Sequence, residues 1–154
     1  MISLSIYKFY SKNLEVYDNQ LIGKNNTEQN KNNLIKNLKY DVKFDDDTKY
    51  SITATESEIT YIDNNEIVLM KIVKGIFEDK KGSSLKIESK SAIFNNNNYN
   101  TIFENNVKIN YMGNVIKSDK LILDFEENTV VIRDNIIYEG LQGLGKADNV
   151  IINL

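Results

Sequence analysis

The sequence contains no cysteine, histidine, tryptophan or proline, and its only arginine is Arg133. Without cysteine and histidine the chain has no zinc site of the Cys/His type, no cysteine nucleophile, no Ser-His-Asp triad and no disulfide. We therefore expect no metal site, no cofactor and no enzyme activity. The net charge is −3 and the lysines are scattered along the chain. Because nucleic acid selects a clustered basic face, we also expect no nucleic-acid partner.

The composition divides the 154 residues into three segments. Residues 1–12 begin with the apolar run MISLSIYKFY, which is shorter than the roughly 20 apolar residues of a membrane-spanning helix. They are either the remnant of an N-terminal membrane anchor or an ordinary frayed terminus. Residues 13–37 are rich in Asn, Lys and Gln and predict a polar tether. Residues 38–154 carry the folded domain.

The folded domain has the alternation of β-strands. Apolar and polar residues alternate around Tyr40, Val42 and Phe44, and again from residue 50 to residue 55. Clusters of Asp, Asn and Gly separate the apolar runs and predict turns at 63–65, 81–83, 95–98, 112–114 and 126–128. No segment of this region has a helical period. We therefore predict an all-β domain with about ten to twelve short strands.

An internal repeat organises these strands. Small residues that precede a return to Ile or Leu lie at intervals of 35, 29 and 29 residues: Ala54, Ser89, Ser118 and Ala147. Repeats of short strands bury their apolar faces only by stacking on one another. The sequence thus predicts a β-jellyroll of stacked antiparallel strands, with a repeat of about 29 residues and an open apolar trough.

Two sets of residues follow from this architecture. The apolar and small positions in phase with the repeat are trough candidates: Ile52, Ala54, Leu69, Ile87, Ser89, Ile109, Ile116, Ser118, Leu121, Leu123, Ile132 and Tyr138. The alternative is that they form an ordinary sandwich core. The first and last strands are open edges to which another β-rich protein can add a strand, and the candidate edge residues are Tyr40, Val42, Phe44, Ala147, Val150 and Ile152.

Three stretches carry a resemblance to a known family: YSITATESEI, FENNVKINYMGNVIKSDKLILDFEENTVVI and IIYEGLQGLGKADNVIINL. They are similar to the lipopolysaccharide-export proteins of the LptC and LptA family, whose domains are OstA-like β-jellyrolls. The similarity covers residues 38–154. The order of apolar start, polar tether and jellyroll resembles LptC with a shortened anchor, whereas LptA begins with a cleaved signal peptide.

The resemblance implies a function and a location. An LptC-like chain is a single-pass inner-membrane protein with its main domain in the periplasm. It accepts lipopolysaccharide from the inner-membrane ABC transporter and passes it along a β-jellyroll bridge to LptA. By the same resemblance, the N-terminal edge faces the transporter's jellyroll and the C-terminal edge faces the LptA-like protein. The trough candidates would then hold the acyl chains of the lipid.

Three other functions stay open on the sequence alone. The chain could be a non-catalytic β-solenoid scaffold or adhesion protein with a dry core, or an LptA-like soluble bridge protein. It could also be a polysaccharide-acting enzyme that uses carboxylates such as Glu56, Glu58, Asp119 and Asp124. Acidic residues on strand exteriors are expected in any case, so the enzyme is the weakest of the three.

Overall fold

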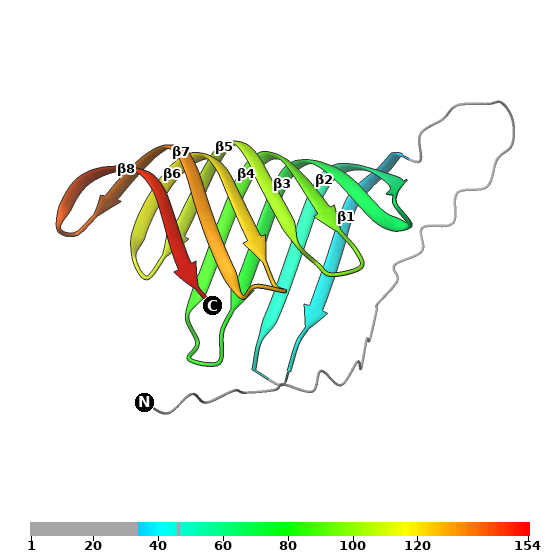
Figure 1. The fold of residues 1–154 in the computed structure, drawn as a ribbon, viewed down its shortest axis with the longest axis horizontal. Coiled ribbons are helices and arrows are strands. Elements are labelled where there is room, and N and C mark those ends of the chain that lie inside the picture. Colours follow the sequence, from blue (N-terminus) through cyan, green and yellow to red (C-terminus); the bar gives the residue numbers. More distant parts are fainter. Residues whose placement is uncertain (1–33, 46) are drawn as a thin grey trace, which may run out of the picture.

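The computed structural model describes residues 34–45 and 47–154, which form one eight-stranded sheet (Figure 1). The strands lie in chain order and each is antiparallel to the next. Their bounds are β1 Leu34–Lys43, β2 Lys49–Ile62, β3 Asn65–Glu78, β4 Ser84–Asn95, β5 Thr101–Tyr111, β6 Asn114–Asp124, β7 Thr129–Gly140 and β8 Gly143–Asn153. This confirms the all-β prediction. The described residues include no helix capable of crossing a membrane.

Short turns connect consecutive strands, and five of the seven connections lie at the positions that the sequence predicts. Asp63 and Asn64 between β2 and β3 have φ values of 49° and 63°, and Gly113 between β5 and β6 has a φ of 78°. This left-handed conformation is costly for most residues but common for Gly, Asn and Asp. The Asn- and Gly-rich clusters therefore mark the hairpin ends correctly.

A line of irregular residues crosses all eight strands and bends the sheet. At this line the pairing between neighbouring strands skips a residue or shifts register. Several residues on it have left-handed φ angles, among them Asn37 at 54°, Ile72 at 53° and Asn105 at 66°. Bulges of this kind kink a strand and increase its twist. We call this line the crease; it comprises Asn37, Thr55, Ile72, Lys90, Asn105–Asn106, Asp119, Asp134–Asn135 and Asp148.

The crease divides the sheet into two halves that fold over one another (Figure 1). Half A comprises residues 38–43, 49–54, 73–78, 84–89, 107–111, 114–118, 136–140 and 143–147. Half B comprises residues 34–36, 56–62, 65–71, 91–95, 101–104, 120–124, 129–133 and 149–153. Every strand thus contributes to both halves. The side chains that point into the fold form the core.

The prediction of ten to twelve strands was wrong, and the crease explains the error. In β3, Val68 and Met70 are buried on one side of the crease and Val73 and Phe77 on the other. The inward parity therefore changes by one residue at Ile72. A period-2 pattern that breaks in the middle of a 14-residue strand reads as two short strands.

The sheet also begins earlier than predicted. β1 starts at Leu34 and Leu34 pairs with Glu58, so residues 34–37 belong to the sheet and not to the tether. Lys36, also in β1, pairs with Glu56 in β2, so β1 extends into half B. The predicted anchor remnant, residues 1–12, and the rest of the tether, residues 13–33, lie outside the described residues.

Candidate functional site: the apolar interior between the half-sheets

The inward faces of the two halves enclose one continuous apolar interior. A register row of half A runs across all eight strands and consists of Tyr40, Ile52, Gly75, Ile87, Ile109, Ile116, Tyr138 and Gly145. Half B contributes two inward rows: Ser57, Met70, Ala92, Phe103, Leu121, Ile132 and Val150, and Ile59, Val68, Phe94, Thr101, Leu123, Val130 and Ile152. Because each row follows hydrogen-bonded neighbours, the interior runs along the length of the sheet.

Side chains from one half contact the other half directly. The rings of Tyr40 in half A and Phe94 in half B have centroids 5.0 Å apart. Gly75 in half A faces the ring of Phe103 in half B, and a Cβ atom on Gly75 would lie 2.7 Å from Cζ of Phe103. Only glycine leaves room for the ring at this approach. The interior is therefore filled by its own side chains in this structure, and Leu123 and Ile109 are 0% exposed.

One buried hydrogen bond joins the halves. The hydroxyl of Tyr50 in half A lies 2.8 Å from Oγ1 of Thr101 in half B. Thr101 donates its own hydroxyl proton to the carbonyl of Tyr99, at 3.0 Å. Tyr50 must therefore be the donor in the bond between the halves, since a hydroxyl has one proton. Burial raises the pKa of Tyr50 well above its ordinary value, so this donor keeps its proton at any physiological pH.

A cluster of aromatic side chains lies at the strand ends that are farthest from the crease, where it covers the interior. Phe125 follows β6 in half B, and its ring centroid lies 4.6 Å from that of Phe44 and 5.1 Å from that of Tyr50. The ring centroid of Phe77 lies 5.8 Å from that of Phe125. Aromatic pairs at these separations attract one another weakly beyond their area burial. This cluster holds the ends of the two halves together near β1, β2 and β3.

The small residues of the sequence repeat lie beside the crease. Ser89 donates its hydroxyl to the carbonyl of Ser91 at 2.8 Å, and Ser118 donates to that of Lys120 at 3.2 Å. These carbonyls lie where the strand ladder is interrupted, so the serines satisfy backbone groups near the bend. Ala54 occupies the same position in β2 and is 4% exposed. The repeat of about 29 residues is thus one hairpin crossing the crease twice.

Eleven of the twelve trough candidates have side chains on the inward face. Ten of these are at most 8% exposed, with Ile52, Ile109, Leu121, Leu123 and Ile132 at 0%. The eleventh, Tyr138, is partly buried and donates to Oδ1 of Asn114. Leu69 is the exception: it is 42% exposed and points outward. Alternation counted back from Val73 places Leu69 inside, but the crease at Ile72 shifts the parity, so Val68 and Met70 point inward instead.

Sequence reasoning missed several residues that fill the interior, above all Phe94 and Phe103, which are 0% exposed. Their neighbours Ile93 and Ile102 are also apolar, so an alternating pattern does not distinguish the inner from the outer face. The Asn-rich turn at 95–98 was the usable signal. It fixes the end of β4 and therefore the parity of its last inward residue, Phe94.

The candidate edge residues lie on or beside the two strands that pair on one side only, β1 and β8. Val42 is buried, and Val150 and Ile152 are partly buried and pack against the core. Phe44 lies just after β1, and Ala147 is exposed in β8. Apart from that of Ala147, the side chains of the edge candidates pack in the interior, so an edge partner would meet chiefly the free backbone groups of the strand.

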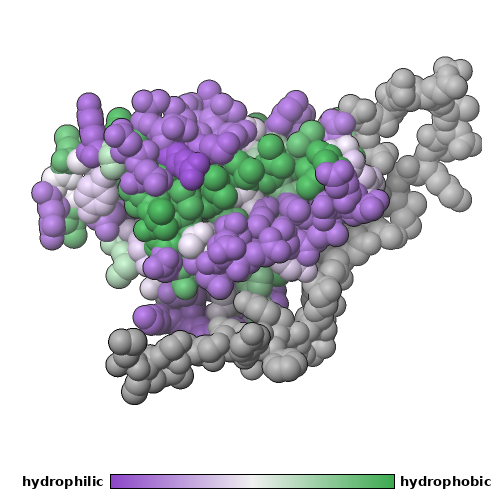
Figure 2. Space-filling view, in the orientation of Figure 1, coloured by the Kyte–Doolittle hydropathy of each residue, from purple (hydrophilic) through white to green (hydrophobic). Residues whose placement is uncertain are grey.

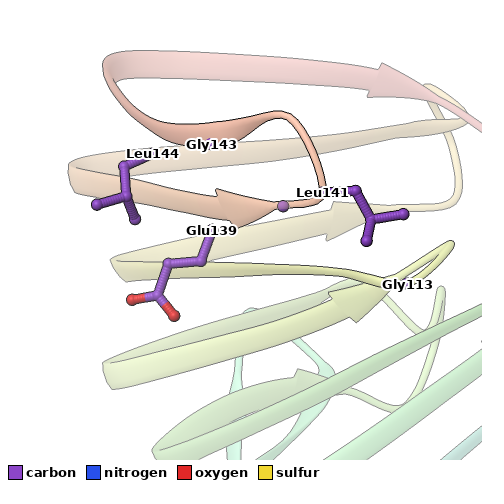
Figure 3. A pocket seen from close by; sticks show the side chains of 6 residues that line it. Gly113, Glu139, Leu141, Gly143 and Leu144 are labelled. Atoms are coloured by element: carbon purple, nitrogen blue, oxygen red, sulfur yellow. The ribbon is translucent and has the colours of Figure 1, made fainter.

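A shallow depression of about 380 Å³ lies at the C-terminal end of half A, between the β5–β6 turn and the β7–β8 hairpin. Leu141 and Leu144, on the hairpin, are 97% and 82% exposed. The side chains of Leu141, Leu144 and Glu139 point in different directions and do not converge on a common point (Figure 3). The described residues hold no cluster of three or more groups that could bind a metal ion. The interior, and not this depression, is therefore the candidate site.

Comparison with known proteins agrees with this architecture. No curated protein matched the sequence. The profile of one protein family, described as "Lipopolysaccharide-assembly, LptC-related", matches residues 1–147. An apolar interior between two half-sheets and a match over nearly the whole sequence lead to one conclusion: the chain belongs to the LptC-related family of lipopolysaccharide assembly, and its role lies in lipopolysaccharide transport.

Proposed function

We propose that this chain receives lipopolysaccharide from the inner-membrane ABC transporter and passes it to an LptA-like protein, with the acyl chains held between half A and half B. The observation that carries the proposal is the continuous apolar interior, whose half A row extends from β1 to β8 and whose half B rows extend from β2 to β8. An acyl chain in an aqueous compartment needs such an apolar environment. The edge strands β1 and β8 would pair with the transporter's jellyroll and the LptA-like protein, respectively.

Lipid entry requires the halves to separate, because the interior side chains now fill the space. Separation exposes apolar surface at a cost of roughly 25 cal/mol per Å². An inserted acyl chain covers the same surface again and offsets most of this cost. The chain has no cysteine and no histidine, and the proposal assigns it no reaction. The energy for transport would come from ATP hydrolysis by the transporter.

We also propose a location for the protein in the cell. The domain would lie in the periplasm, and the protein would be attached to the inner membrane. Fractionation of cells that express the natural gene product tests this part separately. We expect the protein in the inner-membrane fraction, and recovery in the soluble periplasmic fraction would favour the LptA-like alternative.

A cross-link between the halves tests the transfer mechanism. Phe44 lies in the turn directly after the half A segment of β1, and Phe125 lies in the turn directly after the half B segment of β6. Their ring centroids are 4.6 Å apart and both residues are partly exposed. Because the chain has no cysteine, the double variant Phe44→Cys/Phe125→Cys can be joined specifically by a short bismaleimide. The joined protein should no longer take up lipopolysaccharide, whereas the same variant before joining should do so.

The matched control joins two strands within one half. Glu56 and Lys71 are paired across β2 and β3 on the outer face of half B. The variant Glu56→Cys/Lys71→Cys, joined by the same reagent, should take up lipopolysaccharide normally. Equal uptake by both joined proteins would contradict entry between the halves. Absence of uptake by every unjoined protein would instead favour the scaffold with a dry core.

A further inference from the structure

A row of apolar residues lies on the outer face of half B and belongs neither to the interior nor to the edges of the sheet. Six aliphatic residues are consecutive register partners across β3 to β8 and all point away from the interior: Leu69, Ile93, Ile102, Ile122, Val131 and Ile151. We call this row the outer stripe. It extends over about 24 Å, since five strand spacings of nearly 5 Å separate its ends. Figure 2 shows apolar side chains in a band along the long axis of the molecule, bordered by polar ones.

The outer stripe is exposed. Leu69, Ile93 and Ile151 are 42%, 36% and 61% exposed, and the other three members are partly exposed. A monomeric protein seldom presents a contiguous apolar surface of this extent without a use for it. An apolar outer row is also not needed to form the strands, because the same strands have a different outer row in half A. The corresponding outer row of half A is mostly charged and includes Lys39, Lys74, Glu88, Lys108, Lys117 and Lys146.

Rows that are polar except for Ile67 border the outer stripe on both sides. On the crease side the register row is Lys71, Ser91, Glu104, Lys120, Arg133 and Asn149. On the other side Asn95 and Asn100 are linked through a backbone hydrogen bond, and Asn100 donates to Asp124 at 3.0 Å. An apolar centre with a polar margin is the typical anatomy of a protein interface.

We infer that the outer stripe is the interface between two copies of this chain, packed face to face about a two-fold axis parallel to the strands. This axis reverses the stripe, so Ile102 of one copy lies against Ile122 of the other, and Ile93 against Val131. On the crease side, Glu104 then lies opposite Lys120 of the other copy. Lys71 lies opposite Asn149, and Arg133 opposite Ser91. No two like charges meet in this arrangement, which makes the face complementary to itself.

The extent of the face suits a second copy. The outer stripe, the crease-side row and the row on the other side together make 18 residues per copy, close to the 20–30 residues per side of a standard interface. The row on the other side consists of Ile67, Asn95, Asn100, Asp124, Thr129 and Asn153. Two sheets pack face to face in this way in β-sandwiches, with the strand directions nearly aligned. The outer stripe lies on the opposite side of half B from the interior. Both edge strands therefore remain free for their partners, and the inference goes beyond the proposed function.

Two matched variants test the inference. Ile93 in the outer stripe and Ile137 on the outer face of half A are 36% and 39% exposed. We expect sedimentation of the full chain to show a dimer whose formation depends on concentration in the micromolar range. The variant Ile93→Lys should weaken the dimer by at least about tenfold, because it places an unpaired charge against Val131 of the other copy, within the apolar row of the interface. Ile137→Lys should leave the dimer unchanged.

A cross-link identifies the face directly. Packed sheets lie about 10 Å apart, so a bismaleimide of about that span should join two copies of Ile102→Cys but not of Lys117→Cys. A chain that remains monomeric at submillimolar concentration would overturn the inference. So would a dimer that persists with Ile93→Lys and is joined at neither position, which would point to the edge strands. Binding of the monomer to lipid vesicles, lost in Ile93→Lys, would also overturn it and would assign the stripe to a membrane surface.

Discussion

The hydrogen bond between Tyr50 and Thr101 yields a quantitative prediction about the closed state of the two halves. Tyr50 is 1% exposed and Thr101 is 0% exposed. The variant Tyr50→Phe removes the donor but leaves the hydroxyl of Thr101 bonded to the carbonyl of Tyr99. The loss is one neutral hydrogen bond, which contributes about 0.5–1.5 kcal/mol to the free energy of unfolding.

The variant Thr101→Val should cost more than Tyr50→Phe. It removes the acceptor and leaves the buried Tyr50 hydroxyl without a partner, which costs about 1–3 kcal/mol. It also removes the bond to the Tyr99 carbonyl, a further loss of about 1 kcal/mol. In the double variant no buried hydroxyl is left unsatisfied at Tyr50, so its cost should be smaller than the sum of the two single costs by about 1 kcal/mol or more.

Urea denaturation of the four proteins, followed by circular dichroism, measures these free energies. The slope of the transition should be the same in all four proteins, because the same surface is exposed on unfolding. A smaller cost for Thr101→Val than for Tyr50→Phe would refute the assignment of Tyr50 as donor. Additive single costs would refute the contact between the halves itself.

Three further predictions follow from particular residues. Ile72 has a φ of 53° and is 63% exposed. Because asparagine tolerates this conformation, Ile72→Asn should raise the free energy of unfolding by about 1 kcal/mol, as measured by urea denaturation. A loss of stability would contradict backbone strain at the crease. Gly75→Ala should destabilise by about 1–3 kcal/mol because its Cβ meets the ring of Phe103, and Phe103→Leu should recover part of the loss; equal stability of Gly75→Ala and wild type would show that the halves are not in contact there. Burial opposes ionisation of Asp45, but hydrogen bonds from Lys80 and Thr48 lower its pKa to about 2, below the usual value near 4. Its contribution to stability is therefore present above pH 4 and lost as the pH falls toward 2, and Asp45→Asn should show a smaller loss of stability over that interval.

The sequence was informative wherever a residue type has one structural use. Asn64 and Gly113 marked hairpin ends because left-handed backbone favours them. Ser89 and Ser118 kept a constant interval because each lies beside the crease once per hairpin. The edges β1 and β8 followed from the order of the repeats.

The sequence could not reveal the crease itself. Asn105–Asn106 and Asp134–Asn135 have the residue types of turns yet lie within single strands. Such irregular residues shift the inward parity within a strand. The same shift at Ile72 misplaced Leu69, and shifts of this kind made some single strands look like two short strands in the sequence. The outer stripe also made it impossible to tell inward from outward residues by hydrophobicity. Ile122 and Leu123 are both apolar, yet they face opposite sides of half B. Only three-dimensional register separates them.

Photo-crosslinking in cells tests the central claim most directly. A photoreactive amino acid at Leu123, which is 0% exposed and faces the interior, is compared with one at the neighbouring Asp124, which faces outward. If lipopolysaccharide passes between half A and half B, an adduct forms at residue 123 and not at residue 124. Absence of an adduct at residue 123, in a folded protein of normal abundance and with transport running, would contradict the account. An adduct at residue 124 alone would place the lipid on the outer face instead.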